Sequence, residues 1–142
     1  MICLPAVLGT TRVLTSLDVY RRLDVRQQTM VAYLERTGLT RLYTDYWSCN
    51  RFAFQSNERV VCAVLDEHMH SGLDRYRPYR ALVHAARYPT YAFPRSLPQA
   101  GWLRQVGAGR HAVSCDGYLI ITLRGPAVPS LTAQEQARCS LS

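Results

Sequence analysis

The densest group of potentially reactive side chains is a short stretch near the middle of the chain. Asp66, Glu67, His68 and His70 place two carboxylates and two imidazoles within five residues. This combination suits zinc and related divalent metals. However, His68 and His70 are two positions apart, and side chains at this spacing diverge on a helix. We therefore interpret the stretch as a polar, solvated loop. The alternative is a stand-alone, metal-dependent cytoplasmic enzyme that uses this loop.

Two carboxylates are better placed, because each directly follows a predicted strand. Asp45 comes after residues 40–44 and Asp66 after residues 59–65. In open α/β sheets, ligands bind outside the carboxyl ends of the strands. The alternative is that Asp45 caps a helix and Asp66 forms a turn. Three side chains that follow the second strand are candidates for the same edge: Arg75, Tyr76 and Tyr79.

No motif characteristic of an enzyme accompanies these candidates. No glycine-rich phosphate loop follows a predicted strand, and Ser48 and Ser114 lack the glycines of a nucleophile elbow. The cysteines form no CxxC pair, so a structural zinc site is not expected. They are Cys3, Cys49, Cys62, Cys115 and Cys139. We expect no catalytic residue, no metal and no cofactor in this chain.

The composition is that of one folded domain. The chain has 142 residues, of which 48% are hydrophobic and 19% are charged, and this length allows a single hydrophobic core. It contains 17 basic residues, all of them arginine, against 10 acidic ones, and its formal net charge is +7. The arginines are scattered along the sequence, which argues against a nucleic-acid partner. The excess of positive charge favours attraction to anionic lipid or phosphate surfaces.

Hydrophobic periodicity predicts alternating helices and strands. The first helix runs from Thr15 or Ser16 to about Leu34, and the Asp116-Gly117 pair predicts a terminal hairpin. Strands separated by helices form parallel sheets. The predicted fold class is therefore α/β: a small three-layer domain with a mostly parallel central sheet, helices on both faces and a C-terminal β-hairpin at one edge. The other predicted elements are strands at 40–44, 59–65 and 89–94, helices at 46–54, 76–86 and 97–106, and hairpin strands at 111–115 and 118–123.

Three regions are expected along the chain. Residues 15–125 form the α/β domain, residues 1–14 an N-terminal stub, and residues 126–142 a flexible polar tail. The apolar opening, residues 1–8, is interrupted by Pro5 and is too short to span a membrane. It is nevertheless compatible with the end of a membrane helix that continues upstream.

A pattern in the middle of the chain resembles a known family. Residues 43–56 contain a Tyr-x-Asp-Tyr-Trp motif and an aromatic helix, a short apolar strand follows, and Arg-Tyr-x-Pro-Tyr occurs at residues 75–79. Together with residues 91–94, these segments resemble the soluble C-terminal extracytoplasmic region of bacterial multi-spanning membrane glycosyltransferases of the dolichyl-phosphate-mannose mannosyltransferase type. The resemblance covers residues 27–124.

The resemblance implies a non-catalytic accessory domain on the extracytoplasmic side of the membrane. The catalytic acid of that family lies in its membrane portion, so it is not carried over to this chain. The implied partners are the glycosyltransferase core or the membrane surface, and the implied ligand is a sugar or a lipid phosphate, which aromatic, amide, carboxylate and arginine side chains recognise. For Tyr46 and Trp47 the alternative is a place in the core. The candidate ligand-binding residues are Asp45, Tyr46, Trp47, Asn50, Arg51, Asp66, Arg75, Tyr76 and Tyr79.

The implied location also bears on two of the cysteines. Cys49 lies on the predicted aromatic helix and Cys62 on the strand that follows it. A short connection packs a helix against its neighbouring strand, which can bring two Cα atoms to the roughly 5.5–6 Å of a disulfide. An extracytoplasmic location permits this bond, whereas the cytoplasm keeps thiols reduced. We therefore predict a Cys49–Cys62 disulfide, with two unlinked buried thiols as the alternative.

Overall fold

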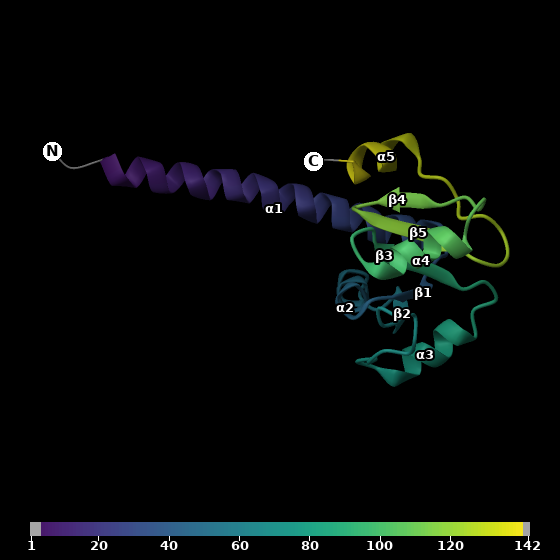
Figure 1. Cartoon of the computed structure of the whole chain (residues 1–142). Helices are drawn as coiled ribbons and strands as arrows, with labels where there is room; N and C mark the ends of the chain where they lie inside the picture. The colour runs from purple at the N-terminus through teal and green to yellow at the C-terminus, as the bar shows by residue number, and fades with distance from the viewer. Residues whose placement is uncertain (1–3, 141–142) are drawn as a thin grey trace.

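The protein is a small α/β domain with a five-stranded mixed sheet and five helices in the part of the chain that the structure describes (Figure 1). The computed structural model describes residues 4–140, with side chains from residue 17 onward. Helices and strands alternate in the predicted order as far as the terminal hairpin. In chain order the elements are α1 (Leu4–Arg36), β1 (Arg41–Thr44), α2 (Tyr46–Gln55), β2 (Val61–Val64), α3 (Arg77–His84), β3 (Thr90–Pro94), α4 (Pro98–Val106), β4 (Val113–Cys115), β5 (Tyr118–Thr122) and α5 (Ala133–Cys139).

Helix α1 is longer than the periodicity predicted. It begins at Leu4 instead of Thr15 or Ser16, so the expected boundary between stub and domain falls inside one continuous helix. Pro5 does not prevent this, because it lies in the first turn, where the missing N–H has no intrahelical partner. In Figure 1 the N-terminal half of α1 extends away from the rest of the domain.

The C-terminal end of α1 is anchored in the core. Met30, Tyr33 and Leu34 are fully buried, whereas Tyr20, further toward the N-terminus, is 68% exposed. The helix ends as predicted before Gly38, whose φ of 71° is a conformation that glycine adopts readily.

The sheet has the strand order β2-β1-β3-β5-β4 and is parallel in only one half. Strand β1 pairs in parallel with β2 and β3, whereas β5 pairs antiparallel with β3 and β4. The expectation of a mostly parallel sheet is therefore confirmed only in part. The hairpin lies at one edge, as predicted, and its turn residues Asp116 and Gly117 have φ values of 51° and 74°, which match a type I′ turn.

Helices contact the sheet on both faces. On one face, α1, α2 and α5 cover a core that includes Leu42, Phe52 and Ile120. On the other face, α4 packs over β3 and β5, and α3 lies against β2 and β1 at the opposite end of the sheet. All four residues of β2 are buried, as the continuous apolar run predicted for a strand covered on both faces.

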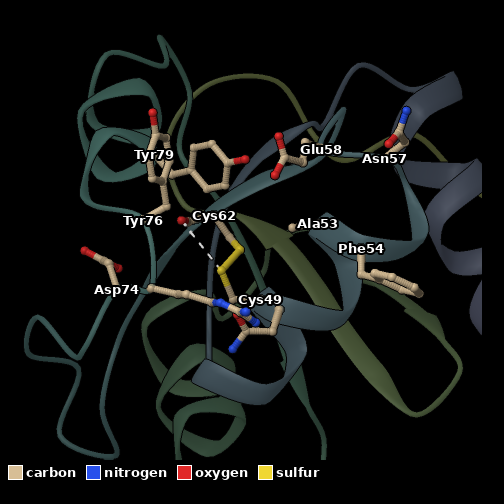
Figure 2. Close-up of a pocket in the computed structure, with 11 residues that line it drawn as sticks. Cys49, Ala53, Phe54, Asn57, Glu58, Cys62, Asp74, Tyr76 and Tyr79 are labelled. Carbon is tan, nitrogen blue, oxygen red and sulfur yellow. Dashed lines mark hydrogen bonds between the residues drawn. A yellow bond between two sulfur atoms is a disulfide. The ribbon is translucent and has the colours of Figure 1, made fainter.

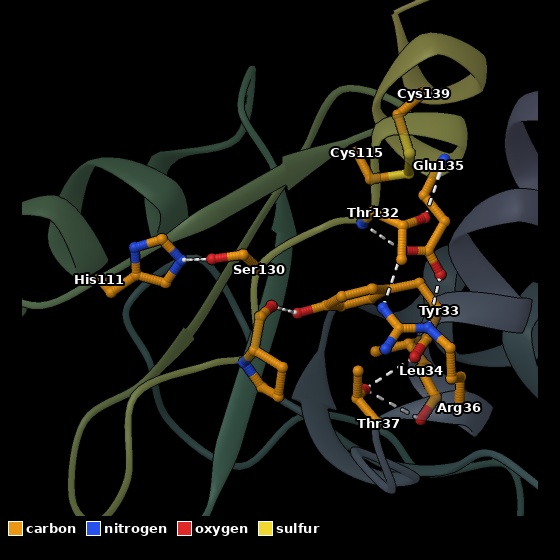
Figure 3. Close-up of polar contacts among 11 residues, drawn as sticks. Tyr33, Leu34, Arg36, Thr37, His111, Cys115, Ser130, Thr132, Glu135 and Cys139 are labelled. Carbon is orange, nitrogen blue, oxygen red and sulfur yellow. Dashed lines mark hydrogen bonds and ion pairs between the residues drawn. A yellow bond between two sulfur atoms is a disulfide. The ribbon is translucent and has the colours of Figure 1, made fainter.

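The C-terminal segment is packed against the domain through residue 140, which differs from the expected flexible tail (Figure 3). Helix α5 begins with a capping box, in which Thr132 and Glu135 exchange side-chain and backbone hydrogen bonds. A disulfide joins Cys139 on α5 to Cys115 on β4, with 4.7 Å between their Cα atoms. Val128 is 2% exposed, so the segment that leads to α5 also contributes to the core.

Polar contacts fasten the same segment to α1. The guanidinium of Arg36 donates two hydrogen bonds to Glu135, at 2.8 and 2.7 Å (Figure 3), and this interaction lowers the pKa of the Glu135 carboxyl. The Tyr33 hydroxyl donates to the carbonyl oxygen of Pro129 at 2.5 Å, and burial raises the pKa of Tyr33 to about 12. Residues nearly 100 positions apart thereby order the C-terminal segment, which local sequence patterns do not reveal.

Candidate functional site

A cavity with a volume of about 850 Å³ forms a groove beside the edge strand β2 (Figure 2). One wall is the outer side of α2 and the loop that follows it, and the other is the segment that leads into α3. The residues that line it are Cys49, Asn50, Ala53, Phe54, Asn57, Glu58, Cys62, Asp74, Arg75, Tyr76 and Tyr79. We call this cavity the α2–α3 groove.

The α2–α3 groove brings together four of the nine candidate ligand-binding residues. They are Asn50, Arg75, Tyr76 and Tyr79. Tyr76 and Tyr79 lie edge to face, with 4.7 Å between their ring centroids, and Tyr76 is 56% exposed. An exposed aromatic ring beside an amide and a guanidinium can stack on an apolar surface while the polar groups bind hydroxyl or anionic groups.

A disulfide forms the floor of the groove. It joins Cys49 on α2 to Cys62 on β2, with 5.6 Å between their Cα atoms (Figure 2). This is the pairing that the sequence predicts, and it holds α2 against the edge strand. Since four cysteines are in disulfides, none of these four is available as a nucleophile.

Acidic groups in the groove come from positions that the sequence did not single out. Glu58 lies beside Tyr79, whose pKa is raised by burial and by the neighbouring Glu58 carboxylate. Asn57 and Glu58 have φ values of 50° and 62°, an unusual conformation for residues other than glycine. The only signal in the sequence is the polar break after the aromatic helix. Phe54, 86% exposed, lies across the groove from the tyrosines (Figure 2).

Five candidate residues lie outside the lining of the groove, and Asp45 is the first of them. Its carboxylate accepts hydrogen bonds from the backbone N–H groups of Trp47 and Ser48, both at 3.1 Å. Asp45 is therefore the N-cap of α2, the alternative that the sequence left open. Tyr46 packs against the core, whereas Trp47 is 79% exposed, so the core interpretation holds for only one of the two aromatic residues.

Arg51 belongs to a polar cluster between α2 and the hairpin. It donates a short hydrogen bond to the Tyr118 hydroxyl, which lies 2.7 Å from the hydroxyl of Ser48. Asp116 is part of the same cluster and forms an ion pair with Arg26 of α1 at 3.1 Å. These side chains meet at the junction of α1, α2 and the hairpin, where the Nε atoms of Arg26 and Arg51 are buried without a hydrogen-bond partner among the described residues. Arg51 therefore does not line the groove.

The cluster makes a pH-dependent prediction for Asp116. Its side chain is 7% exposed, and burial raises the pKa of its carboxyl above the ordinary 3.8 despite the opposing effect of Arg26. Because the folded protein disfavours the charged Asp116 carboxylate, the unfolding free energy of the wild type decreases as the pH rises from 3.8 through the pKa of Asp116 in the folded state.

The variant that tests this is Asp116→Asn, because asparagine tolerates the same turn conformation and does not titrate. We expect the unfolding free energy of the wild type, minus that of the variant, to be largest below pH 3.8 and to decrease at higher pH. Urea unfolding at a series of pH values measures this difference. A difference that stays constant, or grows with pH, would contradict the prediction.

The loop with two histidines is a turn organised by Asp66. The Asp66 carboxylate accepts hydrogen bonds from the backbone N–H groups of His68 and His70, at 2.9 and 2.8 Å. These hydrogen bonds lower the pKa of its carboxyl. Among residues 17–140, no three histidine, cysteine, aspartate or glutamate side chains are grouped so that they could hold a metal ion. Asp66 therefore forms a turn, which was the alternative to a ligand-binding role, and it does not line the groove.

Comparison with known proteins identified no relative: no family model matches the chain, and no curated protein and no solved structure matches it. Within residues 4–140, no helix has the length and apolar character needed to cross a bilayer.

Proposed function

We propose that this chain is a non-catalytic binding domain whose α2–α3 groove holds a sugar. The observation that carries the proposal is the lining of that groove, where the exposed ring of Tyr76 lies among amide, carboxylate and guanidinium groups. A sugar ring offers an apolar face for stacking and hydroxyls that both donate and accept hydrogen bonds. Asn50, Glu58 and Arg75 supply the complementary acceptors and donors.

The proposed setting is the extracytoplasmic side of a membrane, next to a glycosyltransferase. Two disulfides support an oxidising compartment. The resemblance of residues 27–124 to the soluble region of lipid-linked-sugar glycosyltransferases supports a glycosyltransferase as the partner. Arg75, whose guanidinium has no ion pair within residues 17–140, supplies a group for the phosphate of a lipid-linked donor.

Calorimetric titration with methyl mannoside and with mannosyl phosphate tests the groove. We expect saturable binding that Tyr76→Ala weakens at least tenfold, because a stacking surface is removed; tenfold corresponds to about 1.4 kcal/mol. Arg75→Gln should weaken the binding of mannosyl phosphate more than the binding of methyl mannoside. Both residues are exposed, so neither change is expected to unfold the domain.

The matched control is Tyr20→Ala, which removes a tyrosine of similar exposure from α1, outside the groove. This variant should bind like the wild type. If Tyr20→Ala and Tyr76→Ala weaken binding equally, or if neither sugar binds the oxidised wild-type protein, the groove is not a sugar site.

A further inference from the structure

A second cavity, of about 550 Å³, lies where strands β1 and β3 begin and β5 ends. Its walls are three connecting segments: residues 37–40 after α1, residues 86–88 after α3, and residues 126–129 after β5. We propose that this cavity binds a small molecule that carries a phosphate group. None of its lining residues belongs to the α2–α3 groove, so the inference is independent of the proposed sugar site.

The charge of the second cavity is entirely positive. Arg41 and Arg87 line it, and no aspartate or glutamate does. The ion pairs between arginines and carboxylates within residues 17–140 do not include Arg41 or Arg87. Arg87 lies over the ring of Tyr88, 5.2 Å from its centroid, a contact that leaves its N–H donors unused. Two guanidinium groups without carboxylate partners favour an oxyanion, to which arginine binds in a planar fork.

Two threonine residues add hydroxyl groups to the lining of the cavity. Thr90 and Thr122 are directly paired across β3 and β5, are 1% and 4% exposed, and line the cavity. As part of the cavity lining, they place hydroxyl groups that can donate hydrogen bonds to a ligand. Phosphate oxygens would accept hydrogen bonds from this pair of hydroxyls.

The arrangement suits phosphate attached to a small organic group. Hydroxyl donors at the bottom of the cavity and guanidinium donors at its rim match an anion with several acceptor oxygens. The volume of about 550 Å³ is within the range of small-molecule sites and exceeds the needs of the anion alone. The ring of Tyr88, 39% exposed, offers an apolar surface for the remainder of the ligand.

NMR titration of the oxidised, full-length protein with inorganic phosphate tests the proposal, with chloride at the same ionic strength as the reference. We expect saturable shifts of the amide signals around the cavity, at residues 37–41 and 86–90. The double variant Arg41→Gln/Arg87→Gln should weaken phosphate binding at least tenfold. Thr90→Val/Thr122→Val should also weaken it, because valine keeps the shape of threonine but has no hydroxyl to donate to phosphate.

The matched control is Arg77→Gln/Arg104→Gln, which removes the same charge from two exposed arginines outside both cavities. It should leave phosphate binding unchanged. Equal weakening by both arginine pairs, or binding that survives Arg41→Gln/Arg87→Gln, would overturn the proposal. If the protein bound phosphatidic acid vesicles but showed no saturable response to inorganic phosphate, the proposed small-molecule site would be wrong and the cavity would belong to a lipid-binding surface.

Discussion

Replacing Arg80 with alanine is expected to lower the unfolding free energy by about 3–5 kcal/mol, the cost of leaving one member of a buried ion pair unpaired. The guanidinium of Arg80 forms an ion pair with Asp74, and the two side chains are only 19% and 8% exposed. Without Arg80, the Asp74 carboxylate would remain buried without its counter-charge. Urea unfolding of the wild type and of Arg80→Ala measures the effect.

The location of the Arg80–Asp74 pair explains the large expected loss of stability. Strand β2 is an edge of the sheet, and the unpaired backbone groups of an edge strand need partners. Asp74 accepts from the N–H of Val64 at 2.8 Å, and Arg80 donates to the carbonyl oxygen of Val64 at 2.7 Å. Arg80 also donates to the Ser71 hydroxyl at 3.0 Å. The pair therefore closes the edge and holds the loop that carries Arg75 and Tyr76 into the groove.

Two variants control this experiment. Arg80→Lys keeps the charge but has no planar fork, so it should recover only part of the lost stability. Arg77→Ala removes an exposed arginine from the same helix and should change stability by no more than about 0.5 kcal/mol. If Arg77→Ala and Arg80→Ala were equally destabilising, the ion pair would not be the cause.

Removing the Cys49–Cys62 disulfide is the second change for which we expect a large effect. The bond closes a short loop, with a sequence separation of 13, and the double variant Cys49→Ser/Cys62→Ser should lose about 3 kcal/mol of unfolding free energy. The physical reason is that the cross-link restricts the unfolded chain. Urea unfolding under non-reducing conditions measures the loss.

The second disulfide provides the matched comparison. Cys115→Ser/Cys139→Ser releases α5 from β4, so native-state hydrogen exchange should increase mainly in α5. In Cys49→Ser/Cys62→Ser the increase should instead include α2 and β2, which the first disulfide joins. If Cys49→Ser/Cys62→Ser lost less than about 1 kcal/mol of unfolding free energy, the expected contribution of this disulfide would be contradicted. Five reactive thiols in denatured wild-type protein from an oxidising compartment would contradict the Cys49–Cys62 bond itself.

Features that depend on neighbours in the sequence could be predicted from the sequence. Asp116-Gly117 specifies a tight turn because both residues tolerate positive φ. Asp45 stands where its carboxylate can accept from the first N–H groups of α2. The Cys49–Cys62 pair follows from a helix that packs back on the next strand. In each case the interacting residues are at most 13 positions apart in the chain, so the pattern of neighbouring elements contains the interaction.

Features that depend on long-range packing were decided only by the tertiary structure. The α2–α3 groove exists because Glu58 and Tyr79, 21 positions apart in the chain, meet beside the edge strand. The C-terminal segment is ordered because Glu135 meets Arg36 of α1. Likewise, Asp45 and Asp66 both follow strands, yet their carboxylates are used by nearby backbone N–H groups and do not form a shared site. Sequence patterns show which residues can interact, but only the packing of distant elements determines which of them meet.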